Sequence, residues 1–521
     1  MASPQGGSQV RRKIAKKVAR RKRRELKRLD KARAQRFVRG LDSTPVLAAN
    51  GIRYELSQKV QAIAHGGIGM MFKPAQNVGL VDAIDNRLRL LKVHAPYQDS
   101  DHVMANVLNM LCGGSRLENL ELLRNDEALL NAVGADSIPD PTSAGDDCRR
   151  FNECAIDALT SAIHTARLNV WSRQSPEFFS EAVIDVDGVI VGTTGECREG
   201  MDMPFKGVRG CHPLLVSFCN PREVLVIVNR PGNVHSAETA AGKLDQAIAL
   251  CSVAGFRQIR MRGDCKFSQT EHPDRWDALG VKFTFGCEGR AVLKGIAEDS
   301  RASAWKPLKR TKREIQTVER AKPQNVKREI ICRCGYLHVE PGHEDVAESE
   351  YKPTACDSAY RMIVVRKTIT TERGDSVLFD EIRYLFCISN DPPSVAPEQV
   401  VSHCSKRCDQ ENLIAQLKSG VRSLCAPSDN LLSNGASVLM TSLAWTLKSW
   451  AALLLPIAPG QKAKHEAERT QMLTMEFRTF PDQMIHLPCQ IIRHARKVIY
   501  RMLNWRDLTP AFIRLCDSLQ I

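Results

Sequence analysis

The sequence predicts an α/β protein, in which a β-rich insertion interrupts a mixed-sheet core and α-helical regions flank the core at both ends. Three patterns predict this class. Helical periodicity covers residues 41–170, strands alternate with helices over 178–290, and helical periodicity resumes at Ala396 after a strand-rich stretch. With 521 residues, 43% of them apolar, the chain can form several domains, and an intrinsically disordered protein is excluded.

Residues 1–40 form a basic arm. They contain 16 Lys and Arg against Glu25 and Asp30, or +14, so that the remaining 481 residues contribute only +1 to the net charge of +15. Like charges one helical turn apart repel each other, and we therefore expect the arm to be disordered without DNA. A solvated tail is the alternative, but so many cations favour binding to nucleic-acid phosphates through counterion release.

Other features of the composition exclude whole classes of protein. No apolar stretch follows the N-terminal charges, so we expect no secretory signal and an intracellular protein. The most apolar late segment, Ala444 to Pro456, contains Lys448 and is too short to span a membrane. The 18 cysteines include no Cys-x-x-Cys pair, and we expect reduced structural thiols.

Helical patterning follows the arm and then gives way to strands that alternate with helices. Residues 41–170 carry amphipathic stretches separated by Gly113-Gly114 and by Pro139 and Pro141, which predicts a compact helical domain. The first part of the core, 178–290, has expected strands at 182–187, 212–219, 223–228, 258–262 and 281–285, with helices at 236–254 and 272–279.

The alternation of strands and helices lapses after residue 290. Residues 291–395 predict the β-rich insertion, with paired strands at 360–365 and 382–388 and a basic stretch at 301–328 that holds 10 Lys and Arg against two Glu. Residues 396–455 predict the second part of the core, in which Leu431 to Leu455 is apolar nearly all round and thus a buried helix. Residues 456–521 predict a C-terminal helical region.

Two core strands end in an acid. Asp187 closes the strand at 182–187, and Asp264 follows the strand at 258–262 after Gly263. Strand ends in open α/β sheets commonly bind ligands, and two close carboxylates are usually stabilised by Mg²⁺ or Mn²⁺. N-cap or turn acids are the alternative. Asp185 shares a strand face with Asp187, so periodicity cannot separate them, and Asp185 remains an alternative ligand.

A third acid lies on a predicted helix. Arg407, Glu411 and Lys418 lie at offsets of 0, +4 and +11, which places all three on one face of an α-helix. This face can serve a metal ion and a phosphate together. An ordinary surface ion pair between Arg407 and Glu411 is the alternative.

These motifs resemble those of bacterial insertion-sequence transposases of the DDE superfamily. The resemblance rests on the strand at 183–188, on Gly210 to Leu214, on the turn at 229–233 and on Arg262 to Phe267, followed by the third motif, Tyr-x2-Arg-x3-Glu-x6-Lys. Arg407, Glu411 and Lys418 fit that motif, whereas Cys404 occupies its Tyr position. The resemblance covers about 178–455 and implies an RNase H-like core with a β-strand insertion before the catalytic Glu.

The resemblance also implies an activity. Asp187, Asp264 and Glu411 would hold two Mg²⁺ (or Mn²⁺) ions for in-line phosphoryl transfer, and Lys418 and Arg407 would contact the DNA backbone. A bacterial, cytoplasmic enzyme would bind terminal inverted repeats through residues 41–170, cut the DNA and join it to target DNA, as a homodimer on two ends. A stand-alone metal-dependent nuclease and an inactive DNA-binding derivative are the rival functions.

Weaker candidates for the site have structural roles that explain them as well or better. His212 is expected to be a packed histidine rather than a base, and Trp305 can belong to a core as readily as it can stack on a DNA base. Arg230 and Asn233 could contact DNA, although the turn at Pro231-Gly232 needs polar residues in any case. Lys206 and Arg209, in the loop after the first strand, could reach the site.

Overall fold

The computed structural model describes residues 60–92, 96–193, 195, 198–203, 207–269, 271–309, 330, 333–334, 337–373, 376–494 and 497–519, with positions 20, 23–24, 26–32, 34–35, 38 and 54 before them. Much of the basic arm 1–40, residues 310–328 of the basic stretch and Lys206 lie outside the described residues.

The centre of the molecule is a sheet with the strand order β6-β5-β2-β7-β8. Its strands are β2 (Ala182–Gly188), β5 (Leu214–Phe218), β6 (Glu223–Val228), β7 (Ile259–Gly263) and β8 (Lys282–Cys287). β2, β5 and β6 pair antiparallel, whereas β7 and β8 run parallel to β2. All five strands that the sequence predicts for the core are present.

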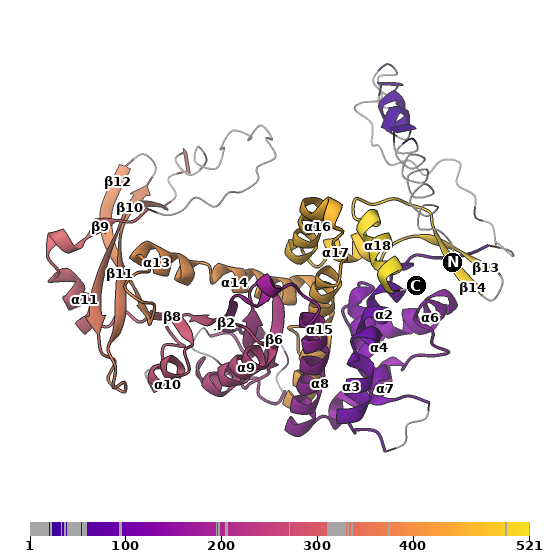
Figure 1. The fold of residues 1–521 in the computed structure, drawn as a ribbon, viewed down its shortest axis with the longest axis horizontal. Coiled ribbons are helices and arrows are strands. Elements are labelled where there is room, and N and C mark those ends of the chain that lie inside the picture. Colours follow the sequence, from indigo (N-terminus) through magenta and orange to yellow (C-terminus); the bar gives the residue numbers. More distant parts are fainter. Residues whose placement is uncertain are drawn as a thin grey trace.

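Helices cover both faces of this core. α9 (Ala240–Ala254) packs on β2, β5, β6 and β7, and α10 (Pro273–Ala278) connects β7 to β8. On the other face, α13 (Pro397–Ser405) and α14 (Cys408–Ala415) follow one another along the sheet, from the insertion towards its centre (Figure 1). A short two-stranded sheet, β3 (Val191–Gly192) with β4 (Gly210–Cys211), lies beyond the end of β2.

The strands of the insertion continue the core sheet. β12 (Ser376–Ser389) pairs antiparallel with β8, and β11 (Tyr360–Arg373), β10 (Leu337–Tyr351) and β9 (Lys306–Pro307) follow in turn, which gives nine strands. The paired strands expected at 360–365 and 382–388 are the inner parts of β11 and β12. Figure 1 shows these long strands extending well past the core, with α11 (Ala291–Glu298) beside them. The domain boundaries at 291 and 395 remain predictions.

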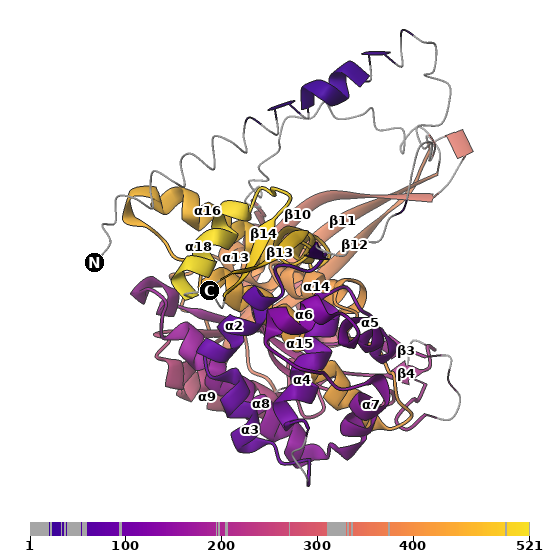
Figure 2. The ribbon, with the colours of Figure 1, turned by 90° about the vertical axis from the view of Figure 1, so that its right-hand side faces the viewer.

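The residues before the core form a cluster of helices around the long α15 (Leu431–Leu453), as Figure 2 shows. These helices are α2 (Gly69–Asn77), α3 (Leu80–Arg87), α4 (Asp99–Leu111), α5 (Leu120–Arg124), α6 (Glu127–Val133), α7 (Pro141–Arg150) and α8 (Glu153–Trp171). α15 is buried from Ser433 to Leu453, as its apolar sequence predicts. Among the helices of the described ranges, none is long and apolar enough to cross a membrane.

One buried carboxylate joins the core to this helical cluster. Glu223, at the start of β6, is fully buried. Its carboxylate accepts hydrogen bonds from Arg167 Nε (2.8 Å) and from Trp171 Nε1 (2.9 Å), both on α8. It also accepts one from Trp450 Nε1 on α15, at 2.9 Å. A single side chain therefore connects β6, α8 and α15.

The C-terminal region is not purely helical, so this part of the sequence prediction is wrong. Besides α16 (Lys462–Thr474), α17 (Thr479–Met484) and α18 (Thr509–Leu519), it contains the strands β13 (Cys489–His494) and β14 (Lys497–Met502). β13 pairs with β14 and with β1 (Gln61–Ile63), more than 400 residues earlier in the chain. Because this strand pairing is so distant in sequence, local periodicity does not reveal it.

Lys448 of α15 is a buried cation. Its ammonium donates a hydrogen bond to Leu473 O (2.9 Å) and lies 4.1 Å from the centroid of the Trp445 ring. Burial, with a smaller contribution from Arg222, lowers the pKa of Lys448 to about 7. The folded chain thus binds one proton fewer than the unfolded chain between about pH 7 and pH 10, so its stability should rise with pH over this window.

We expect Lys448→Met to raise the melting temperature most at pH 7 and below. The advantage should shrink as the pH rises towards 10, by up to about 1.4 kcal/mol per pH unit, because the cost of deprotonating Lys448 on folding falls as the pH approaches the pKa of the unfolded lysine. Thermal melts at several pH values measure this. Lys462→Met, at an exposed lysine of α16, is the control, and an advantage that stays constant with pH would contradict the expectation.

Candidate active site

Asp187 and Asp264 lie at the ends of two neighbouring parallel strands. β2 pairs with β7 in a register that aligns Val186 with Gly263, so the two acids follow at the same edge of the sheet. Asp187 has a side chain only 16% exposed. The carboxylate of Asp264 accepts a hydrogen bond from Lys266 N at 2.8 Å, which fixes the turn after β7. The register therefore brings together the two strand-end acids that the sequence singles out.

The electrostatics of Asp187 couple it to the other two acids. Burial raises the pKa of Asp187 to about 6, and the carboxylates of Asp264 and Glu411 act in the same direction, whereas Arg407 opposes them. Such a carboxyl group is costly to ionise unless further positive charge is nearby. The three carboxylates thus repel one another electrostatically, and a bound cation would relieve this repulsion.

Arg407 spans two of these acids. Its Nη1 lies 3.3 Å from Asp187 Oδ2, and its Nη2 lies 3.3 Å from Glu411 Oε1. The ion pair with Glu411 is the ordinary i,i+4 pair that a surface helix would show, but the contact with Asp187 connects α14 to β2. Glu411 keeps 56% of its side chain exposed, so it remains open to a ligand.

Asp185 has a different environment from Asp187. Its carboxylate is buried and receives two hydrogen bonds from Arg262, from Nε at 2.6 Å and from Nη2 at 2.7 Å. Arg262 lies directly opposite Asp185 in the register of β2 and β7. Asp185 is therefore already paired within the sheet, which favours Asp187 as the acid that faces a ligand. Sequence reasoning missed Arg262 because its partner depends on strand register.

Gln410 holds α14 on the sheet. The sequence patterns did not single out this residue either. Its buried side chain donates hydrogen bonds from Nε2 to Asp185 O (3.2 Å) on β2 and to Leu215 O (3.1 Å) on β5. Because Gln410 directly precedes Glu411, these contacts fix the height and rotation of the helix that presents the third acid. The sequence pattern that could have revealed Gln410 is a polar residue on the otherwise apolar, buried face of an amphipathic helix.

Lys418 does not lie on a continuous α-helix with Arg407, so that prediction is wrong in its geometry. The α-helix ends at Ala415, and a π-helical turn, Gln416–Gly420, follows. The wider turn changes the direction of Lys418 relative to an α-helical continuation. The ammonium of Lys418 nevertheless donates a hydrogen bond to Ile190 O at 3.0 Å, in the segment that leaves β2 after Asp187.

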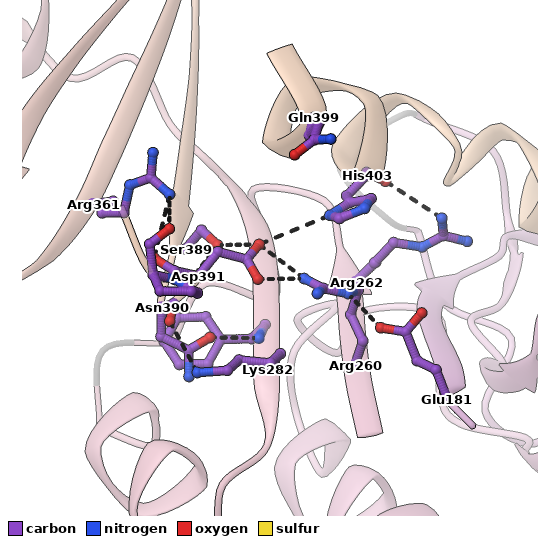
Figure 3. A network of polar contacts seen from close by, with 12 residues as sticks. Glu181, Arg260, Arg262, Lys282, Arg361, Ser389, Asn390, Asp391, Gln399 and His403 are labelled. Carbon is purple, nitrogen blue, oxygen red and sulfur yellow. Dashed lines mark hydrogen bonds and ion pairs between the residues drawn. The ribbon is translucent and has the colours of Figure 1, made fainter. Parts of the chain in front are cut away.

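A polar network ties the return from the insertion to the core (Figure 3). Arg260 Nη1 of β7 donates to both carboxylate oxygens of Asp391, at 2.9 and 2.8 Å. Burial acts to raise the pKa of Asp391, but His403 and Arg260 hold it down, at about 2. Arg262 Nη1 donates to His403 O at 3.4 Å, so α13 is connected to the strand that ends at Asp264.

Cys404, at the Tyr position of the third motif, lies near the end of α13. Its half-buried side chain packs on an apolar cluster that includes Val346, Ile363 and Cys387 of the insertion strands and Val400 of α13. Packing inside this cluster leaves the thiol facing the insertion strands.

The weaker candidates have mostly structural contacts. His212 is buried, and its Nδ1 lies 3.2 Å from Val234 O. Arg230 is buried and donates to the carbonyl oxygens of His212, Ser236 and Glu238. Trp305 stacks against Arg366, with 4.4 Å from the guanidinium carbon to the ring centroid. The structure thus favours a packing role for His212. Arg209 and Asn233 are exposed.

The donor chemistry of the three acids suits a hard divalent cation, which prefers carboxylate oxygens. Within the described ranges, however, no three His, Cys, Asp or Glu side chains lie close enough together to hold a metal ion. The guanidinium of Arg407 bridges Asp187 and Glu411 and supplies positive charge there. Metal binding would therefore require this guanidinium to turn away, for which its partly exposed position leaves room.

Three comparisons place the chain among known proteins. The model of the family described as Transposase DDE domain group 1 matches residues 59–520. No curated protein matches the chain. Among solved structures, it is similar to the cryo-EM structure of a piggyBac transposase synaptic complex with hairpin DNA, with 10% identity, 80% of this chain and 88% of that chain covered, and a TM-score of 0.33.

Proposed function

The chain belongs to the family described as Transposase DDE domain group 1, and from this premise we propose a cut-and-paste DNA transposase. The enzyme binds the terminal inverted repeats of a bacterial insertion sequence, cleaves DNA at their ends and joins the freed 3′ ends to target DNA. The observation that carries this proposal is the meeting of Asp187 and Asp264 at adjacent strand ends, with Arg407 connecting Asp187 to Glu411.

In this proposal, each side chain has a defined role. Asp187, Asp264 and Glu411 would hold two Mg²⁺ or Mn²⁺ ions, which supply activation of the attacking oxygen and stabilisation of the leaving oxygen. Without bound metal, the guanidinium of Arg407 bridges the carboxylates of Asp187 and Glu411, and it would turn away from them when the ions bind. Lys418 and Arg407 would contact the phosphate beside the cut.

The proposed partners are two DNA ends and a second copy of the chain. Cutting both ends together calls for a homodimer in a synaptic complex, and the helices within 41–170 are the proposed end-binding region. The reaction would take place in the cytoplasm, on DNA of the nucleoid.

Cleavage of an end-containing DNA fragment tests the proposal. Inverted repeats flanking the gene supply the end sequence, and the purified chain is incubated with labelled end DNA in Mg²⁺. We expect nicks at the repeat boundary that expose a 3′-hydroxyl and that a chelator prevents. Bound but uncut DNA, with no binding of Mn²⁺, would instead favour the inactive DNA-binding derivative.

Deleting residues 1–40 should weaken DNA binding without abolishing cleavage of pre-bound ends. The arm contains 16 Lys and Arg, and each phosphate contact it makes contributes about −0.9 to the slope of log affinity against log salt. The truncated protein should therefore bind less tightly at low salt and show a shallower slope. Filter binding at several salt concentrations measures both quantities, and an unchanged slope would exclude this role for the arm.

A further inference from the structure

The π-helical turn Gln416–Gly420 is an unusual continuation of a helix at an active site. Its defining hydrogen bond runs from Val421 N to Gln416 O at 2.8 Å, five residues back, and Arg422 follows in the left-handed region with φ of 59°. π turns are rare and often occur at functional sites, and a left-handed non-glycine residue adds strain. Contacts from outside the helix must therefore hold this turn in place.

Those contacts come from the C-terminal region. Phe477 N donates a hydrogen bond to Gln416 Oε1 at 2.9 Å. Arg478 directs both Nε and Nη2 onto the carbonyl oxygen of Ser419, at 3.1 and 2.8 Å. A β-carbon on Gly420 would lie 3.1 Å from Cβ of Phe477, so the two segments approach closely. The residues directly before α17 thus hold the side chain of Gln416 and the backbone of Ser419, which lie on either side of Lys418.

These contacts fix the backbone around Lys418. Ser419, which accepts both hydrogen bonds from Arg478, follows Lys418 directly, and Leu417 before it is fully buried. The side chain of Lys418 in turn reaches Ile190 O at 3.0 Å, three residues after Asp187. The orientation of the Lys418 ammonium near Asp187 therefore depends on a turn that Phe477 and Arg478 hold in place.

We propose that Arg478 is a positioning residue for DNA cleavage, which acts by fixing the turn that aims Lys418 at the DNA phosphate. The inference rests on the proposed function. It extends the active site to the C-terminal region, which no sequence motif connects to the three acids. Arg478 itself makes no contact with DNA in this proposal and acts only through Lys418.

A double-mutant cycle tests this dependence in the full-length protein. Single-turnover cleavage of end DNA in Mg²⁺, at saturating DNA, is measured for the wild type, Arg478→Ala, Lys418→Ala and the double variant. Lys418→Ala should slow cleavage by on the order of 100-fold. Arg478→Ala should slow it roughly 10-fold, because small misplacements of a catalytic group are costly. In the Lys418→Ala background, Arg478→Ala should change the rate by less than about twofold.

Two further variants separate positioning from general destabilisation. Arg478→Lys keeps a donor for Ser419 O and should recover most of the rate. Arg514→Ala removes a comparable arginine of the same region, which donates to Pro456 O and Glu468, and should leave the rate unchanged at temperatures where it is folded.

The outcomes distinguish this inference from the proposed function. Equal rates for the wild type and Arg478→Ala, or an equal loss in both backgrounds, would overturn the positioning role while the transposase proposal stands. No cleavage by the wild type would overturn both.

Discussion

Asp264→Asn and Glu411→Gln are each expected to abolish DNA cleavage while leaving binding of end DNA within about a few-fold of wild type. Both changes keep the shape of the side chain and remove the negative charge that would hold a divalent cation. Losing an essential catalytic group typically costs on the order of 10⁴-fold or more in rate. Single-turnover cleavage in Mg²⁺ and a gel-shift assay on the same DNA measure the two quantities.

A matched control is Asp299→Asn, which removes one negative charge at an exposed residue after α11 and should cleave at the wild-type rate. Asp187→Asn should behave like the two active-site variants. Cleavage near the wild-type rate by Asp264→Asn or Glu411→Gln would remove that residue from the site, whatever the fold.

The second large effect concerns stability. Glu223→Ala should destabilise the protein by roughly 3–5 kcal/mol, because it leaves the guanidinium of Arg167 buried without its counter-charge. The same change removes the acceptor for the indole N–H groups of Trp171 and Trp450. Since these residues lie on α8 and α15, the loss should loosen the helical cluster from the core.

Thermal or denaturant unfolding, followed by tryptophan fluorescence, measures this effect. Glu121→Ala is the control, because the ion pair of Glu121 with Arg124 is exposed and should contribute less than about 1 kcal/mol. Glu223→Gln should fall between the wild type and Glu223→Ala, since an amide oxygen can still accept hydrogen bonds. Similar stabilities for Glu223→Ala and Glu121→Ala would show that the buried network contributes little.

Much of the core follows from local sequence patterns. Runs of apolar residues bounded by turns locate β2, β5, β6, β7 and β8 to within a few residues. The same patterns single out the two strand-end acids, because a carboxylate directly after a buried apolar run pays a desolvation cost that a partner must offset. The ion pair between Arg407 and Glu411, which was the alternative interpretation of their spacing, is present in the structure.

What the sequence could not supply depends on contacts between distant segments. Asp185 and Asp187 share a strand face, and only the register with β7 reveals that Arg262 pairs with Asp185. The π turn that contains Lys418 is held by Arg478, 60 residues later, so helical periodicity alone gave the wrong continuation. Likewise, the strand β13 is fixed by its pairing with β1.

The most direct test of the central claim is strand transfer. Pre-cut end DNA with a free 3′-hydroxyl is incubated with a target plasmid, Mg²⁺ and either the wild-type protein or Asp187→Asn, and joined products are sequenced. We predict that the wild type joins the 3′ ends to the plasmid and that Asp187→Asn forms no joined product. No joined product from a wild-type preparation that cleaves uncut end DNA would make the protein a nuclease, and joining by Asp187→Asn would contradict the assignment of the site.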